Sequence, residues 1–200
     1  EAHAGNSKGT RFHVLLVFSL VPLVFLSRVL SLHVLKSAPS NMLLSIVVPV
    51  YNEVEALPTL LSTLQSVMAG TRHSYEIVLV DDGSTDGTTE ALKRAAARDS
   101  HVKALFFSRN FGHQAAITAG LDFASGDAVA VIDADLQDPP ELLPEMVVLL
   151  EQGYDVVSAQ RITRSGEGFL KRGTAKLFYW IMRKMVDERI LPEVGDFRLF

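Results

Sequence analysis

The chain has 200 residues, which is enough for one domain of ordinary size. With 48% hydrophobic and 21% charged residues it can bury a core, and this composition excludes intrinsic disorder. Its 19 basic and 23 acidic residues give a net charge of −4, which excludes a polybasic protein that binds nucleic acid. The chain has no cysteine, so disulfides, thiolate zinc sites and cysteine nucleophiles are excluded as well.

Residues 1–41 differ in pattern from the rest of the chain. A 13-residue apolar run from Val14 to Leu26 follows the basic residues Lys8 and Arg11. The run is too short to cross a bilayer, which needs about 20 residues, and it fits the core of a signal peptide better. Two interpretations stay open: a natural leader that lies close to a membrane, or non-native sequence upstream of Met42. In both cases we expect the folded domain to begin at residue 42.

From Leu44 onward, short apolar runs of strand length alternate with amphipathic stretches of helical period. The predicted strands are 44–50, 77–80, 102–107, 128–132 and 156–159. The predicted helices are 57–68, 88–98, 114–124 and 141–152. This alternation predicts an α/β domain with a doubly wound, mostly parallel sheet. Ligands of such domains bind beyond the carboxyl ends of the strands, so the motifs that follow the strands are the candidate sites.

Polar motifs follow each of the first three predicted strands. The first is Pro49-Val50-Tyr51-Asn52-Glu53, which places an aromatic ring and a carboxylate at the sheet edge. The alternative is a turn in which Asn52 caps the following helix. The second, 81–87, is rich in acceptor oxygens and glycine, or is a turn with Ser84 or Asp86 as the cap. The third is 108–114, where His113 equally fits a histidine at a helix start.

A calcium-binding EF-hand loop is excluded for the second of these motifs. Counted from Asp82, the twelfth position is occupied by Lys93, where an EF-hand needs a bidentate Glu. The motif is therefore either a ligand-binding loop or an ordinary turn.

An acidic pair, Asp133 and Asp135, follows the fourth predicted strand. Alternation along an extended segment places both side chains on one side, about 7 Å apart, where they repel each other unless a cation lies near them. Oxygen donors favour Mg²⁺ or Mn²⁺ over Zn²⁺, and Mg²⁺ commonly shares its ligands with substrate phosphates. The alternative is that Asp135 and Asp138 only cap the helix that begins at Pro139-Pro140. No P-loop or dinucleotide-binding fingerprint is present, so a metal would carry the charge of a diphosphate.

The motifs together resemble a known family. In this order, Pro49-Val50-Tyr51-Asn52-Glu53, Asp81-Asp82-Gly83-Ser84 and Asp133-Ala134-Asp135 resemble the family 2 glycosyltransferases, which have the GT-A fold. Asn110-Phe111-Gly112-His113, the stretch 133–141 and Gly195-Asp196-Phe197-Arg198 narrow the resemblance to the polyprenyl-phosphate glycosyltransferases, such as dolichyl-phosphate mannose synthase and bacterial undecaprenyl-phosphate glucosyltransferases. The resemblance covers about residues 44–200.

The resemblance implies a donor site for a nucleotide sugar. Residues implied to bind the nucleotide sugar are Pro49, Tyr51, Glu53, Asp133 and one or both of Asp81 and Asp82. The residues implied to hold Mg²⁺ or Mn²⁺ are Asp133 and Asp135, with Gln137 close to the metal or the phosphates. By likeness to the bacterial branch we expect UDP-glucose as the donor, with GDP-mannose next.

The acceptor site is expected near the end of the chain. From Arg161 to Arg189 there are eight basic and three acidic residues, and an amphipathic helix is predicted over about 168–187. Such a helix suits the interface of an anionic membrane, or it packs on the sheet as an ordinary amphipathic helix. The resemblance implies that Arg161, Arg164 and Arg172 bind the phosphate of a polyprenyl phosphate and that Asp196 lies near the sugar or the acceptor.

The expected reaction is one in-line displacement that inverts the anomeric carbon. A lipid monophosphate is already ionised near neutral pH, so it needs no strong general base. We expect Asp135, Arg161, Arg164 and Asp196 to be the catalytic residues, in an enzyme at the cytoplasmic face of a membrane. Members of this group usually continue into a short terminal portion of the catalytic domain, and often into two membrane-spanning helices, so the chain is expected to be a fragment of a longer protein.

Two other functions stay open. One is a family 2 transferase that acts on a polysaccharide or a soluble glycan. The other is a non-catalytic module that binds a nucleotide sugar or a metal. The sequence indicates no nucleic-acid partner and no oligomeric state.

Overall fold

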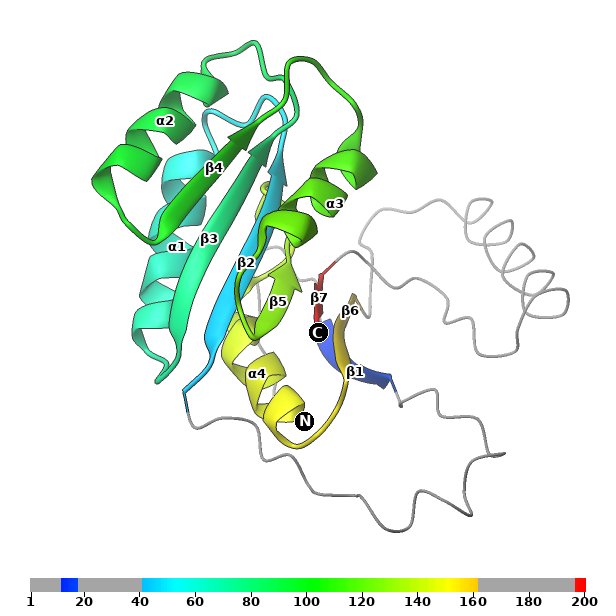
Figure 1. The fold of residues 1–200 in the computed structure, drawn as a ribbon. Helices are drawn as coiled ribbons and strands as arrows, with labels where there is room; N and C mark the ends of the chain where they lie inside the picture. Colours follow the sequence, from blue (N-terminus) through cyan, green and yellow to red (C-terminus); the bar gives the residue numbers. More distant parts are fainter. Residues whose placement is uncertain (1–11, 18–40, 162–196) are drawn as a thin grey trace, which may run out of the picture.

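The computed structural model describes residues 12–17, 41–161 and 197–200 of the chain (Figure 1). The strands are β1 (Phe12–Val17), β2 (Leu43–Val50), β3 (Ser74–Asp81), β4 (Val102–Phe106), β5 (Ala128–Val131), β6 (Val156–Arg161) and β7 (Arg198–Leu199). The helices are α1 (Leu57–Ala69), α2 (Thr88–Arg98), α3 (His113–Phe123) and α4 (Leu143–Glu151), with a short 3-10 helix, η2 (Pro140–Leu142), directly before α4.

The strands form one sheet in the order β1-β6-β7-β5-β2-β3-β4. Its centre is parallel, because β2 pairs in parallel with both β3 and β5, and β3 pairs in parallel with β4. Strand β7 runs antiparallel to β5 and β6, and β1 runs antiparallel to β6. The predicted class, an α/β domain with a doubly wound and mostly parallel sheet, is confirmed.

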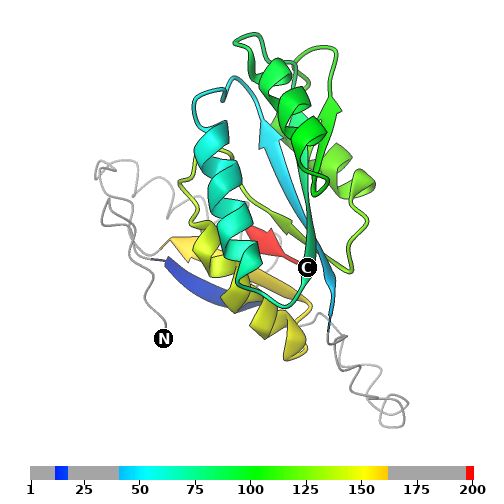
Figure 2. The same ribbon diagram turned by 90° about the vertical axis from the view of Figure 1, so that its left-hand side faces the viewer.

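Helices cover both faces of the parallel strands, which explains why most of β2 and residues 77–80 of β3 are apolar. On one face, α1, α2 and α4 pack on alternate strand residues such as Ile46 and Leu79. On the other face, α3 packs through Ala116 and Ile117 on a smaller cluster that includes Val47. Figures 1 and 2 show α1 and α3 on opposite sides of the sheet.

Helix α1 illustrates how the local sequence sets an element. Leu57, Leu60, Leu64 and Met68 recur at helical spacing, and all four are buried. Pro58 lies in the first turn, where its missing N–H breaks no helical hydrogen bond. Burying one leucine side chain contributes about 1.5–3 kcal/mol, so this one face is enough to hold the helix on the sheet.

The connections place the switch point of the sheet between β2 and β5. The chain runs from β2 to β3 and β4 on one side, and then crosses over through α3 to β5 on the other side of β2. Where the direction of winding reverses in this way, the loops after the two strands separate and leave room for a ligand. A ligand site is therefore expected at the carboxyl edge of the sheet, near the ends of β2 and β5.

A buried carboxylate holds the opposite, amino-terminal edge of the sheet. Glu76 accepts hydrogen bonds from the Ser45 hydroxyl at 2.6 Å and the Ser125 backbone N–H at 2.8 Å, and it pairs with Lys103 at 2.5 Å. Burial by itself raises the pKa of Glu76, but the bonds from Lys103, Ser45 and Ser125 outweigh it and lower the pKa to about 2. This network links the starts of three parallel strands and the loop before β5.

The structure places part of the predicted leader in the sheet. Residues Phe12 to Val17 form β1, which pairs with β6 from Phe12 opposite Arg161 to Val17 opposite Val156. The division of the chain at residue 42, and the leader and non-native interpretations of 1–41, stay predictions.

The predicted amphipathic helix at about 168–187 lies outside the described residues. Within the described ranges, the helices are too short or too polar to cross a bilayer.

Candidate active site

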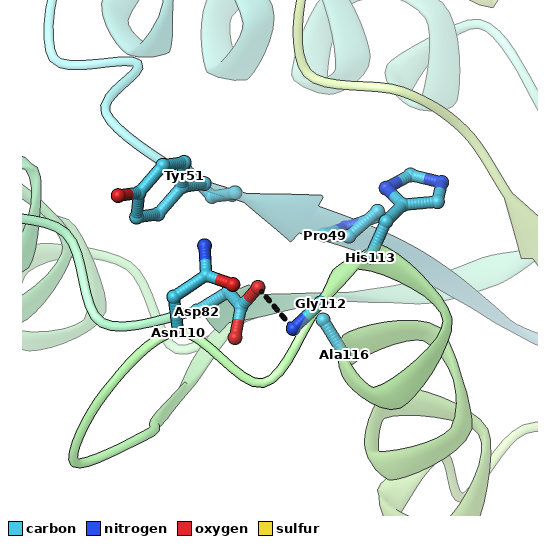
Figure 3. Close-up of a pocket in the computed structure, with 8 residues that line it drawn as sticks. Pro49, Tyr51, Asp82, Asn110, Gly112, His113 and Ala116 are labelled. Carbon is cyan, nitrogen blue, oxygen red and sulfur yellow. Dashed lines mark hydrogen bonds between the residues drawn. The ribbon is translucent and has the colours of Figure 1, made fainter.

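A pocket of about 240 Å³ opens at the carboxyl edge of the parallel strands (Figure 3). It is built from the end of β2, the end of β3 and the loop between β4 and α3. Its lining residues are Pro49, Val50, Tyr51, Asp82, Asn110, Gly112, His113 and Ala116. The structure thus brings together three of the predicted nucleotide-sugar-binding residues, namely Pro49, Tyr51 and Asp82.

Pro49 can stand near the end of a central strand because of the register of β2. The Val47 carbonyl accepts a hydrogen bond from the Ile132 N–H on the β5 side, and the paired part of β5 ends opposite Val47. The backbone groups of alternate residues point to the same neighbouring strand. An N–H at position 49 would therefore point to the β5 side, past the paired part of β5, and not to β3. Tyr51 follows at the rim with a 46% exposed side chain, so its ring is accessible to a ligand.

Asp82 fixes the loop that forms the far wall of the pocket. Its buried carboxylate accepts hydrogen bonds from the backbone N–H groups of Phe111 at 2.7 Å and Gly112 at 3.0 Å. Gly112 has φ 100° and ψ 153°, a conformation that is essentially restricted to glycine. The loop also approaches β3 closely, since a Cβ on Gly83 would lie 2.4 Å from the Arg109 carbonyl carbon.

Asp81 is turned away from this pocket, although it is the neighbour of Asp82 in sequence. Its carboxylate accepts hydrogen bonds from the Ser84 N–H at 2.9 Å and from the Thr89 hydroxyl. It is 1% exposed and does not line the pocket. Through these two hydrogen bonds Asp81 closes the loop between β3 and α2.

The loop after β2 is fastened to the loop after β3. The Asn52 N–H donates to the Ser84 hydroxyl at 2.9 Å, and the Asn52 side-chain oxygen accepts from the Thr85 N–H at 2.9 Å. The Glu53 N–H donates to the Thr88 hydroxyl at 3.0 Å. Asn52 has φ 55°, which Asn tolerates better than most residues. Asn52 therefore joins two loops and does not cap α1, whose cap position is Ala56.

Strand β5 ends at Val131, so the acidic pair lies in the loop that follows it. The predicted extended segment does not reach Asp133 and Asp135, so the expectation that strand alternation places their side chains on one side is wrong. Asp135 lies in a turn, and the next residue, Leu136, has φ 56°. The Asp135 carboxylate accepts a hydrogen bond from the Gln137 N–H at 2.9 Å, while η2 begins at Pro140 with Pro139 in the cap position. Asp135 is therefore not the cap of this helix.

Acidic side chains from three loops share one electrostatic environment. Burial raises the pKa of Glu53, and the negative charges of Asp135 and then Asp86 raise it further. Glu53 therefore lies near the acidic pair, although it does not line the pocket. On the other side, the Nε2 atom of His113 lies 3.6 Å from an Asp133 carboxylate oxygen.

The acidic pair fits a hard divalent cation that is shared with a ligand. Within the described ranges, His, Asp and Glu side chains form no group of three or more that could hold a metal ion on their own. Mg²⁺ is commonly bound by one or two carboxylates together with substrate phosphates, and Asp133 and Asp135 supply that number of oxygen ligands. The charge of Asp135 also raises the pKa of the neighbouring Glu53 carboxyl group, and a cation would relieve this repulsion.

Comparison with known proteins agrees with this geometry. Residues 45–200 match the family model described as Glycosyl transferase family 2. The chain belongs to glycosyl transferase family 2. The family resemblance that the motifs indicated is thereby confirmed.

Two curated relatives of this family 2 chain are similar over most of its length. An uncharacterized glycosyltransferase, YkcC, from Bacillus subtilis is 51% identical over 155 residues, which are 78% of this chain and 48% of the relative. A bactoprenol glucosyl transferase from Shigella phage SfV is 46% identical over 158 residues, which are 79% of this chain and 52% of the relative. The chain thus spans about half the length of the curated relatives that it matches.

A solved structure is also similar. It is Staphylococcus aureus TarS 1-349 in complex with UDP-GlcNAc, which is 26% identical and has a TM-score of 0.47. The similarity covers 57% of this chain and 33% of that chain.

The family 2 pocket also contains residues to which the sequence assigned no role. Asn110, Gly112, His113 and Ala116 line it, and all four belong to the loop after β4 or to the first turn of α3. The available signal was their position after a predicted strand, in the motif 108–114. The motif gave no indication that Asp82 would hold this loop or that His113 would approach Asp133.

Other predicted site residues are only partly described. Gln137 is exposed, and its backbone donates to Asp135. Arg161 is the last residue of β6, where its backbone pairs with Phe12. Arg164, Arg172 and Asp196 lie outside the described residues, and their assigned roles stay predictions.

Proposed function

We propose that this chain is the catalytic part of a metal-assisted, inverting glycosyltransferase. It transfers a sugar from a nucleoside-diphosphate sugar to a polyprenyl phosphate at the cytoplasmic face of a membrane. One observation carries the proposal: the pocket at the ends of β2 and β3 and the acidic pair after β5 lie side by side, joined by the contact between His113 and Asp133. A nucleoside and a metal-bound diphosphate need this arrangement.

The pocket suits the nucleoside. Tyr51 presents an aromatic face at the rim, while Asp82 and Asn110 supply polar groups on the opposite wall. Concave sites that combine a few fixed polar groups with apolar walls are typical for small ligands. Both Asp82 oxygens already accept a backbone hydrogen bond, and each keeps a second lone pair for a ribose hydroxyl or a base N–H.

The acidic pair suits the diphosphate through a cation. Asp133 and Asp135 would hold Mg²⁺ or Mn²⁺, with Gln137 close by. When bound, the ion offsets the negative charge that develops on the departing nucleoside diphosphate. Without it, carboxylates and phosphates at this edge would repel each other.

The acceptor provides its own nucleophile. A phosphate monoester has its second pKa near 6, so it is largely dianionic at neutral pH. One of its oxygens forms a bond to the anomeric carbon while the bond from that carbon to the diphosphate oxygen breaks, and the configuration inverts. Arg161, Arg164 and Arg172 are proposed to orient the attacking phosphate, because guanidinium groups bind phosphate in a bidentate manner. Asp196 is proposed to lie near the sugar or the acceptor.

The relatives guide the choice of substrates. A protein named bactoprenol glucosyl transferase is 46% identical over 79% of this chain, which favours a lipid acceptor and glucose as the sugar. UDP-glucose is therefore the first donor to test and GDP-mannose the second.

The decisive assay uses membranes that contain the full-length protein, with polyprenyl phosphate, Mg²⁺ and radiolabelled UDP-glucose or GDP-mannose. Label that extracts into organic solvent supports the proposal. Label confined to water-soluble glycan would support a polysaccharide or soluble acceptor, and nucleotide binding without turnover would support a non-catalytic module. We expect Asp135→Asn to reduce turnover by about 100-fold or more, and EDTA to abolish it. Glu90→Gln, on the exposed face of α2, serves as the control.

A further inference from the structure

His113 is a pocket residue that also reaches the acidic pair. It lines the pocket together with Pro49 and Asp82, and its Nε2 atom lies 3.6 Å from an Asp133 carboxylate oxygen. Figure 3 shows its ring next to Pro49, on the opposite side of the opening from Tyr51. The side chain is 46% exposed, so a ligand in the pocket can touch it.

The backbone of His113 is held in place from two directions. The preceding residue, Gly112, donates its N–H to Asp82 at 3.0 Å. One turn further along α3, Ala116 and Ile117 are buried against the sheet residue Val47 and its neighbours. His113 is therefore presented by a fixed helix start, which is a suitable base for a residue that positions a ligand.

We infer that His113 contacts the diphosphate of the bound nucleotide sugar, at the point where the nucleotide passes from the pocket to the acidic pair. This inference rests on the proposed function. A nucleotide whose nucleoside lies in the pocket and whose metal-bound phosphates lie at the acidic pair would pass the imidazole, which lines the pocket and lies 3.6 Å from Asp133.

The chemistry of this position favours a phosphate oxygen. An imidazole N–H is a hydrogen-bond donor. The 3.6 Å separation from Asp133 is longer than a hydrogen bond, so a phosphate oxygen at about 2.9 Å would make the shorter contact with Nε2. The first turn of α3 contains no acidic residue, and the positive end of its dipole adds to the attraction for an anion.

Binding measurements separate this role from a structural one. The full-length protein in detergent is titrated by calorimetry with UDP and with uridine, and in parallel with GDP and guanosine, in the presence of Mg²⁺. We expect His113→Ala to weaken the binding of the nucleoside diphosphate by about tenfold and to leave nucleoside binding unchanged. His113→Gln, which keeps an N–H donor, should recover most of the loss. Tyr51→Ala should weaken the nucleoside and the diphosphate alike.

Gln114→Ala is the matched control, because Gln114 is exposed in the same helical turn and does not line the pocket. In steady-state assays His113→Ala should raise the KM for the donor and leave the KM for the lipid acceptor unchanged. If the wild type binds UDP or GDP and His113→Ala binds it equally well, the inference is wrong and the proposed function stands. If the wild type binds neither nucleotide, the proposed function itself is wrong.

Discussion

The carboxylate of Asp82 accepts the backbone N–H of Gly112 at 3.0 Å and so joins the end of β3 to the start of α3. The two residues are 30 positions apart in the chain, and both line the pocket (Figure 3). A second bond, from the Phe111 N–H at 2.7 Å, makes the connection bidentate. The wall that presents Asn110 and His113 therefore depends on one buried carboxylate.

Asp82→Ala should affect both stability and binding. Because the two hydrogen bonds to this charged group contribute about 1.5–3 kcal/mol each, we expect the free energy of unfolding to fall by about 3–6 kcal/mol, with binding of the nucleoside diphosphate weakened at least tenfold. Urea denaturation and calorimetry measure the two effects. Asp82→Asn keeps one acceptor oxygen and should lose about half as much stability. Unchanged binding by Asp82→Ala would show that the loop holds its shape without this carboxylate.

Gly83→Ala should be more destabilising than Gly87→Ala, although both glycines have positive φ. A Cβ at Gly83, with φ +73°, would lie 2.4 Å from the Arg109 carbonyl carbon, whereas a Cβ at Gly87, with φ +99°, meets nothing within 4 Å. Gly87→Ala therefore adds only backbone strain, about 1–2 kcal/mol, while Gly83→Ala adds a backbone clash and should reach about 3 kcal/mol or more. Equal urea midpoints for the two variants would contradict the close approach of the loops.

Asp135→Asn should lower the pKa of Glu53. Burial and the charge of Asp135 both raise that pKa, so removing the charge favours the ionised form of Glu53. Adding Mn²⁺ or Mg²⁺ with UDP should act in the same direction. An NMR pH titration of the Glu53 side chain measures this pKa directly, with Mg²⁺ as the ion. Asp86→Asn should lower the Glu53 pKa by less, because the charge of Asp86 contributes less to the shift. A Glu53 pKa that does not respond to Asp135→Asn would place the acidic pair too far away to share a site with it.

The same shift of the Glu53 pKa has a consequence for stability. The folded state holds this proton more tightly than the unfolded state does, because the pKa is raised in the fold. The associated stabilisation is complete below the pKa of the unfolded chain and is lost as the pH rises through the folded value. Asp135→Asn should therefore reduce the loss of stability between acidic and neutral pH, and this can be followed by urea denaturation at several pH values.

Glu76 should contribute to acid unfolding with the opposite sign. Its pKa is lowered from 4.5 to about 2 in the fold, so its stabilisation is complete above 4.5 and is lost as the pH falls from about 4.5 to about 2. The shift corresponds to about 3 kcal/mol at neutral pH. Glu76→Gln should lose stability of that order at pH 7 and much less at pH 2. Glu90→Gln, on the exposed face of α2, is the control, and an equal response of the two variants would exclude a special role for Glu76.

The apolar runs and the polar motifs that follow them are local properties of the sequence. These two features predicted the α/β class and the edge of the sheet that carries the candidate site. Pro49, Tyr51 and Asp82 line the pocket at that edge, because Pro49 lies near the end of β2 and the other two directly follow β2 and β3, while their roles in binding stay predictions. Helical periodicity likewise identified α1 through Leu57, Leu60 and Leu64.

Only the tertiary structure decided how these motifs meet. Asp81 and Asp82 are adjacent in sequence, yet one closes its own loop and the other reaches across to Gly112. Strand β5 lies beside β2 and not beside β4, and this brings Asp133 within 3.6 Å of His113. Periodicity reports which face of a strand is buried, but which strands become neighbours depends on pairing between distant segments. That pairing therefore determines which side chains lie together at the candidate site.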